Sequence, residues 1–116
     1  MEKFEDLLGC TLQEVKNTGD EIVFKLEDGT FAHLYHDQDC CESVRVEDVI
    51  GELDDLIGSP LLMAEEVVGE SPDGFECGDS CTWTFYKLAT IKGYVTIRFL
   101  GESNGYYSES VSFGVY

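Results

Sequence analysis

The chain has 116 residues and a mass of 13.0 kDa, so we expect residues 1–116 to fold as a single domain. Hydrophobic residues make up 43% of the chain, which is enough for a packed core and excludes wholesale disorder. The 24 Asp and Glu residues against 7 Lys and Arg give a formal net charge of −17 at pH 7. Such a surface repels nucleic acids and anionic membranes, so the composition excludes direct nucleic-acid binding and favours a basic protein partner.

The beginning of the chain, Met1–Asp6, is charged, and no apolar segment of the kind found in signal peptides follows it. No apolar run approaches the roughly 18 residues of a membrane helix. We therefore expect no membrane association and a cytoplasmic location. In a reducing compartment the five cysteines are expected to be thiols or metal ligands rather than disulfides.

The first half of the chain alternates strand and turn signals. A short helix is predicted over residues 3–8 and a strand over 11–16. Two further strands, 21–26 and 30–35, flank Glu27-Asp28-Gly29, and Asp-Gly between apolar runs is a strong hairpin signal. A clean alternation of apolar and polar residues predicts another strand over 43–47.

The middle of the chain predicts one helix and one strand. Apolar residues recur with helical spacing over 48–57, and Gly58-Ser59-Pro60 ends that pattern. Residues 61–68 are ambiguous between helix and strand, and their continuous apolar character after Pro60 favours a strand. Residues 69–81 are rich in Gly, Ser and acidic residues, so they are predicted to form a surface loop.

The last third carries the clearest β pattern. Residues 82–90, 94–100 and 106–113 are rich in aromatic and β-branched residues and are separated by Lys92-Gly93 and Ser103-Asn104-Gly105. They predict a three-strand antiparallel meander. The expected fold class is α+β, a twisted antiparallel sheet of about six strands with one or two short helices against it.

Two short clusters of cysteine and histidine suggest a metal site. His36 precedes Cys40, and Cys77 precedes Cys81, with three residues between the members of each pair. Thiolate and imidazole groups suit zinc, and four of them close a tetrahedron with no open position. The sequence therefore predicts a structural Zn²⁺ held by His36, Cys40, Cys77 and Cys81, and the adjacent Cys41 can take the place of Cys40.

Two other interpretations of these clusters remain. The cysteines can be reduced and without metal, as in a phage structural or regulatory protein. A site with three protein ligands and a water would instead make a small zinc-dependent hydrolase. The spacing matches neither HExxH nor the zinc deaminase pattern, and no orienting group accompanies a Cys–His dyad, so we do not expect an enzyme.

Residues 37–79 hold most of the negative charge, with fourteen Asp or Glu residues and a single basic residue, Arg45. One interpretation is a solvated surface that keeps a small protein soluble. The other is a surface that engages a basic groove on another protein. For the second interpretation the candidate partner-binding residues are Glu52, Asp54, Asp55, Glu65 and Glu66 of a monomeric protein.

Four stretches resemble a family of small proteins encoded by bacteriophages and prophages. They are HDQDCCE (36–42), GELDDLIGSP (51–60), TWTFYK (82–87) and GESNGYY (101–107), and the similarity runs from Leu8 over nearly the whole chain. HDQDCCE matches most closely, whereas Cys77 and Cys81 lie outside the shared pattern.

The chain looks like a metal-containing anti-CRISPR protein of the type II class. The resemblance implies a phage inhibitor that acts in the host bacterial cytoplasm. Its target would be the RNA-guided effector nuclease, whose nucleic-acid channels are strongly basic. It further implies inhibition by stoichiometric binding that stops the nuclease from loading target DNA.

Overall fold

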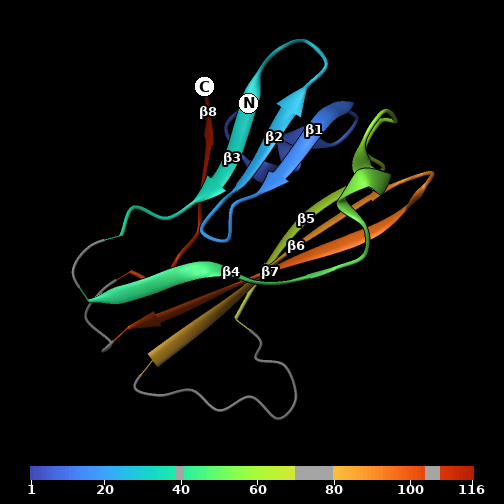
Figure 1. Ribbon diagram of the computed structural model, residues 1–116. Coiled ribbons are helices and arrows are strands. Elements are labelled where there is room, and N and C mark those ends of the chain that lie inside the picture. Colours follow the sequence, from blue (N-terminus) through green and yellow to red (C-terminus); the bar gives the residue numbers. More distant parts are fainter. Residues whose placement is uncertain (39–40, 70–79, 104–107) are drawn as a thin grey trace.

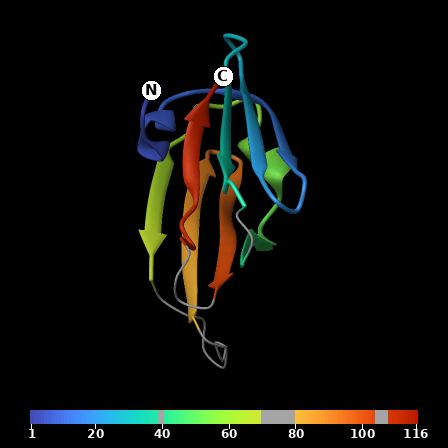
Figure 2. The same ribbon diagram turned by 90° about the vertical axis from the view of Figure 1, so that its left-hand side faces the viewer.

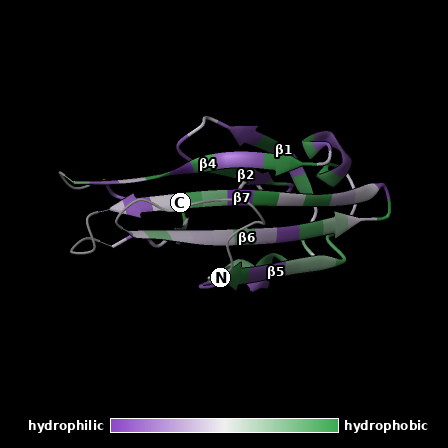
Figure 3. Cartoon of the chain, turned by 90° about the horizontal axis from the view of Figure 1, so that it is seen from below, coloured by the Kyte–Doolittle hydropathy of each residue, from purple (hydrophilic) through white to green (hydrophobic). Residues whose placement is uncertain are grey.

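The computed structural model describes residues 1–38, 41–69, 80–103 and 108–116. Its strands form two antiparallel four-stranded sheets, packed one over the other (Figure 1). The order in the first sheet is β1-β2-β3-β8 and in the second β4-β7-β6-β5, the order seen across the sheet in Figure 3. The strands are β1 (Leu12–Asn17), β2 (Ile22–Leu26), β3 (Phe31–Tyr35), β4 (Glu42–Ile50), β5 (Met63–Val68), β6 (Ser80–Thr90), β7 (Gly93–Ser103) and β8 (Ser112–Val115).

The predicted fold class is confirmed: the described residues form twisted antiparallel sheets with two short helices, both of the 3-10 type. These are η1 (Phe4–Leu7) and η2 (Leu53–Leu56). In the part of the chain that is described, no helix is long and apolar enough to span a membrane. Both termini lie at the same end of the molecule (Figure 2).

Alternating side chains explain the first sheet. In β2 every second residue is buried, and in β3 the alternation continues with the opposite phase, as expected for strands with one face on a core. The two strands pair through the predicted hairpin, where Gly29 has a φ of 89°. A positive φ at this turn costs little free energy because glycine has no Cβ.

The core lies between the two sheets. It joins Phe24 and Leu34 of the first sheet to Tyr86 and Ile97 of the second, all fully buried. Phe4 of η1 closes one side of it, with its ring centroid 4.7 Å from that of Tyr86 and 6.4 Å from that of Phe24. The short helix therefore links the N-terminus to both sheets.

Two elements differ from the sequence prediction. The helix expected over 48–57 is replaced by the end of β4, which pairs with β7 as far as Ile50, followed by the four-residue η2. β-branched side chains on a half-buried strand explain this preference for pairing. The third strand of the expected meander also differs, because β8 leaves the β6–β7 hairpin and pairs with β3 in the other sheet.

Candidate functional site

Cys41 and Cys81, one cysteine from each cluster, lie at the same end of the second sheet. Ser103 of β7 pairs with Glu42 at the start of β4 on one side and with Ser80 at the start of β6 on the other. Cys41 directly precedes Glu42, and Cys81 directly follows Ser80. Segments almost forty residues apart in the sequence are thus placed two strands apart, about 10 Å between backbones.

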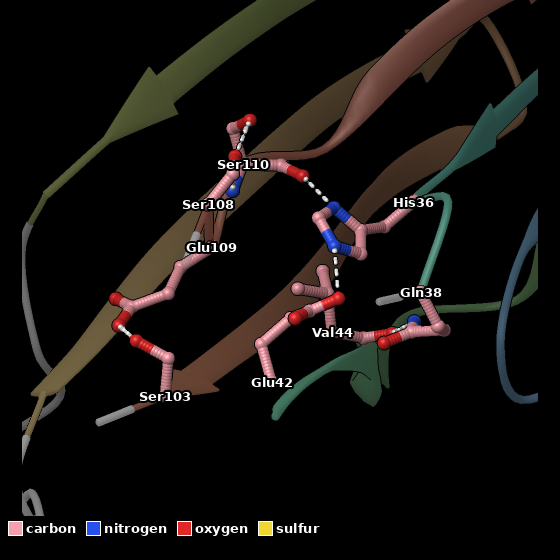
Figure 4. A network of polar contacts seen from close by, with 8 residues as sticks. All are labelled: His36, Gln38, Glu42, Val44, Ser103, Ser108, Glu109 and Ser110. Carbon is pink, nitrogen blue, oxygen red and sulfur yellow. Dashed lines mark hydrogen bonds and ion pairs between the residues drawn. The ribbon is translucent and has the colours of Figure 1, made fainter. Parts of the chain in front are cut away.

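His36 joins this end of the second sheet to the segment that leads into β8 (Figure 4). Its Nδ1 lies 2.7 Å from the carbonyl oxygen of Ser110, and its Nε2 lies 3.2 Å from Oε1 of Glu42. The side chains of His36 and Glu42 are 8% and 1% exposed. The Ser110 carbonyl is an acceptor, so Nδ1 is the donor in that contact. The pair fixes the connection between β3 and β4.

Of the five predicted metal ligands, the structure describes His36, Cys41 and Cys81. Cys41 and Cys81 are both disulfide-bonded, which corrects the expectation of reduced thiols at these two positions. Cys40 and Cys77 lie outside the described residues. A disulfide sulfur is not a thiolate ligand, so the predicted zinc site applies only to the reduced chain.

His36 itself fits the role of a zinc ligand. A histidine that binds zinc through Nε2 commonly donates its Nδ1–H to a backbone carbonyl, as His36 does to Ser110. Among the described residues, however, no three His, Cys, Asp or Glu side chains are grouped to share a metal ion.

Glu109 contacts both β6 and β7 at the same end of the second sheet. Its carboxylate accepts hydrogen bonds from Thr82 Oγ1 at 2.7 Å and from Ser103 Oγ at 2.5 Å, and Ser80 contributes a further one. Partial burial on its own would raise the pKa of Glu109, but the three hydroxyl donors outweigh it and hold the pKa below its ordinary value. The backbone of Glu109 also lies against Gly101, where an added Cβ would clash with the Glu109 carbonyl oxygen.

The first group of candidate partner-binding residues lies at η2. Glu52 and Asp54 are exposed, and Asp55 is half-buried. The backbone carbonyl of Asp55 accepts a hydrogen bond from the Thr90 hydroxyl, and its side chain packs against Gly93 of the β6–β7 hairpin. The turn is thereby fixed to the second sheet, with two carboxylates turned to solvent.

The second group lies on β5, at an edge of the second sheet. Glu65 is opposite Lys87 and Glu66 is opposite Tyr86 on β6, and both carboxylates are exposed. The Tyr86 hydroxyl donates a 2.8 Å hydrogen bond to Oε2 of Glu66. Burial, together with this carboxylate, raises the pKa of Tyr86 far above its ordinary value. Tyr86 therefore remains a neutral donor that orients Glu66.

None of these five carboxylates has an ion-pair partner among the residues that the structure describes. The two groups lie on different elements, η2 and β5. The sequence did not single out Glu42, which contacts His36, or Glu109, which accepts hydrogen bonds from Thr82 and Ser103. Glu42 ends the HDQDCCE stretch and could have been found there, whereas nothing around Glu109 signals its contacts.

No curated protein and no solved structure matches this chain. A family model described as a domain of unknown function (DUF7448) matches residues 5–113. Because this match covers nearly the whole chain, including the cysteine clusters and both acidic groups, the chain belongs to the DUF7448 family.

Proposed function

We propose that this protein is a non-enzymatic inhibitor that binds a basic protein through exposed carboxylates. The observation that carries the proposal is that Glu52, Asp54, Asp55, Glu65 and Glu66 have no ion-pair partner among the described residues, in a chain of net charge −17. Unpaired surface carboxylates raise the rate of encounter with a basic surface.

The partner that we propose is the RNA-guided type II effector nuclease of a bacterial host. The sequence resemblance to phage-encoded anti-CRISPR proteins supports this choice, and so does the charge, because the channel that receives target DNA is strongly basic. Binding there would compete with DNA by occupying the groups that contact its phosphates. The inhibition would be stoichiometric and would need no turnover.

The direct test measures how much protein is needed to stop a purified, guide-loaded type II nuclease from binding labelled target DNA in a gel-shift assay. We expect complete loss of the shifted band near one equivalent. The double variant Glu52→Lys/Asp54→Lys should require about tenfold more protein. Its matched control, Glu2→Lys/Glu5→Lys, makes the same change in net charge at exposed positions outside the acidic segment.

Equal potency of the two double variants would contradict a role for η2. Failure of the unmodified protein to prevent DNA binding at tenfold excess would contradict the proposed partner. If less than one equivalent of the protein went on inactivating the nuclease over time, the protein would be acting catalytically, and stoichiometric inhibition would be contradicted.

We also propose a structural zinc in the reduced chain, supported by the placement of His36 and by the position of Cys41 and Cys81 at one end of the second sheet. Elemental analysis of protein purified with a phosphine reductant and without chelator should find about one zinc per chain. His36→Ala should lower that content. His33→Ala is the matched control, since His33 also pairs with a glutamate, Glu21, but on the other sheet. Absence of zinc from the reduced protein would contradict this part of the proposal.

A further inference from the structure

The two sheets have four edge strands, and three of them are protected against pairing with another strand. β1 has a bulge between Leu12 and Glu14, and the Leu12 carbonyl accepts a hydrogen bond from Gly58. β4 has a bulge between Val46 and Asp48, and the Val46 N–H donates to the Gly19 carbonyl. β8 has only four residues. Bulges, cover and short length are the usual protections of sheet edges.

β5 also has a neighbour, since η1 packs against it, but the second half of the strand differs from the other three edges. Its pairing with β6 is regular from Met63 to Val68, without a register shift. Every residue from Glu65 to Gly69 is exposed, including the apolar side chains of Val67 and Val68, at 36% and 57%. The strand therefore offers a straight edge with accessible apolar and acidic side chains.

The register shows which backbone groups face the open side of β5. The N–H of Gly69 donates to the carbonyl of Trp83, which lies opposite it on β6. In an antiparallel ladder the residues alternate, so 65 and 67 also bond to β6, while Glu66 and Val68 direct their N–H and C=O away from it. An incoming strand can bond to these two residues.

Charge selects the kind of strand that can bind. A second copy of β5 would bring its own Glu65 and Glu66 to the same edge, and like charges close together on paired strands are destabilising. A strand with lysine or arginine among apolar residues would instead pair its charges with these glutamates and its apolar side chains with Val67 and Val68.

We propose that β5 is a docking edge for an extended basic segment of a partner protein, which adds to the second sheet as a fifth strand. This inference rests on the proposed function, because it takes the partner to be basic, and it names the mode of recognition. Backbone hydrogen bonds at Glu66 and Val68 bind the segment, and Glu65 and Glu66 favour a segment with basic side chains.

The test uses a labelled, end-blocked peptide with the repeat Val-Val-Lys-Lys, which can set lysines opposite Glu65 and Glu66 and valines opposite Val67 and Val68, and a peptide with the repeat Val-Val-Glu-Glu is the charge control. Fluorescence anisotropy gives its affinity, and ¹⁵N–¹H spectra locate it on the protein. We expect binding of the Lys peptide alone, with amide shifts concentrated on residues 64–68 and slower amide exchange at Glu66 and Val68.

Two substitutions at one position separate the backbone from the side chain. Val68→Pro removes the outward N–H and keeps the bonds to β6, whereas Val68→Ala keeps the N–H and shortens the side chain. We expect Val68→Pro to weaken the Lys peptide by about tenfold relative to Val68→Ala. The spectrum of each free variant shows directly whether it is folded.

Equal affinities for Val68→Pro and Val68→Ala, amide shifts on another element, or no binding of the Lys peptide would each overturn the docking edge. So would a concentration-dependent dimer of the unmodified protein that buries β5. The gel-shift assay is independent of these results: full inhibition of the nuclease by a folded Val68→Pro variant would remove the docking edge and leave the proposed function standing.

Discussion

At the scale of single residues, polar side chains join segments that lie apart in the sequence. Glu109 collects hydroxyl donors from β6 and β7, and His36 contacts Ser110 across 74 positions of sequence. The sequence could single out His36, because of its cysteine neighbours. It could not single out Glu109, since one carboxylate among 24 acidic residues carries no distinguishing pattern.

The contacts of Glu109 predict a pH-dependent contribution to stability. Its pKa is lowered in the folded chain, so the stabilisation is complete above the unfolded value of about 4.5 and is lost as pH falls through the folded value. We expect Glu109→Gln to lower the free energy of unfolding by about 1–2 kcal/mol at pH 7. The difference from the unmodified protein should shrink below pH ~4.

Urea titrations followed by fluorescence of Trp83, the single tryptophan, measure both quantities. Glu27→Gln is the control, at an exposed carboxylate of the β2–β3 hairpin. A Glu109→Gln effect of the same size at pH 7 and pH 3.5 would contradict the role of the charged carboxylate.

Tyr86 gives a second prediction at this scale. Its ring is fully buried, while its hydroxyl donates to Glu66 at the exposed edge of β5. Tyr86→Phe should cost about 1 kcal/mol of unfolding free energy, because the packing is kept and only the hydrogen bond is lost. Chemical denaturation measures this cost, and a loss above ~3 kcal/mol would show that the ring packing itself had changed.

At the scale of elements, local patterns predicted most strands well. The β2–β3 hairpin follows from Asp28-Gly29, and the strand over 61–68 is observed as β5. The helix over 48–57 was wrong because its apolar spacing also suits a bulged edge strand: the extra residue in β4, Glu47, shifts the alternation by one. Spacing alone cannot separate these two patterns.

The turn between β4 and η2 depends on Gly51. Its φ is 106°, and an added Cβ would lie 2.5 Å from the carbonyl oxygen of Tyr94. Gly51→Ala should therefore lower the free energy of unfolding by at least about 2 kcal/mol. Gly9→Ala is the matched control, because Gly9 has a φ of 84° but open space around it, and it should cost only about 1 kcal/mol. Equal thermal shifts for the two variants would contradict the close approach of β7.

At the scale of the whole molecule, the sequence predicted the β class and the charge but not the division into two sheets. Residues 94–113 form consecutive strand-like runs, which suggested a continuous meander. The chain instead crosses to the other sheet, where Phe113 pairs with Leu34 of β3 and lies 6.3 Å from the ring of Phe4. The pairing of β8 with β3 depends on contacts with residues some eighty positions earlier in the sequence. A local sequence pattern carries no information about such distant contacts.

The separation of the acidic residues is also a property of the whole fold. Glu52 and Asp54 lie at η2, and Glu65 and Glu66 lie on β5, so two carboxylate groups face solvent from different elements. A partner can be attracted by the field of both groups while contacting only one. The charge should then act mainly on the rate of association.

The role of the unpaired carboxylates is tested most directly by the rate of association with the guide-loaded nuclease, measured as a function of salt by surface plasmon resonance. We predict that the association rate falls about tenfold or more between 50 and 300 mM NaCl, while the dissociation rate changes by less than about threefold. An association rate that is constant over this range would contradict the claim that unpaired carboxylates drive recognition.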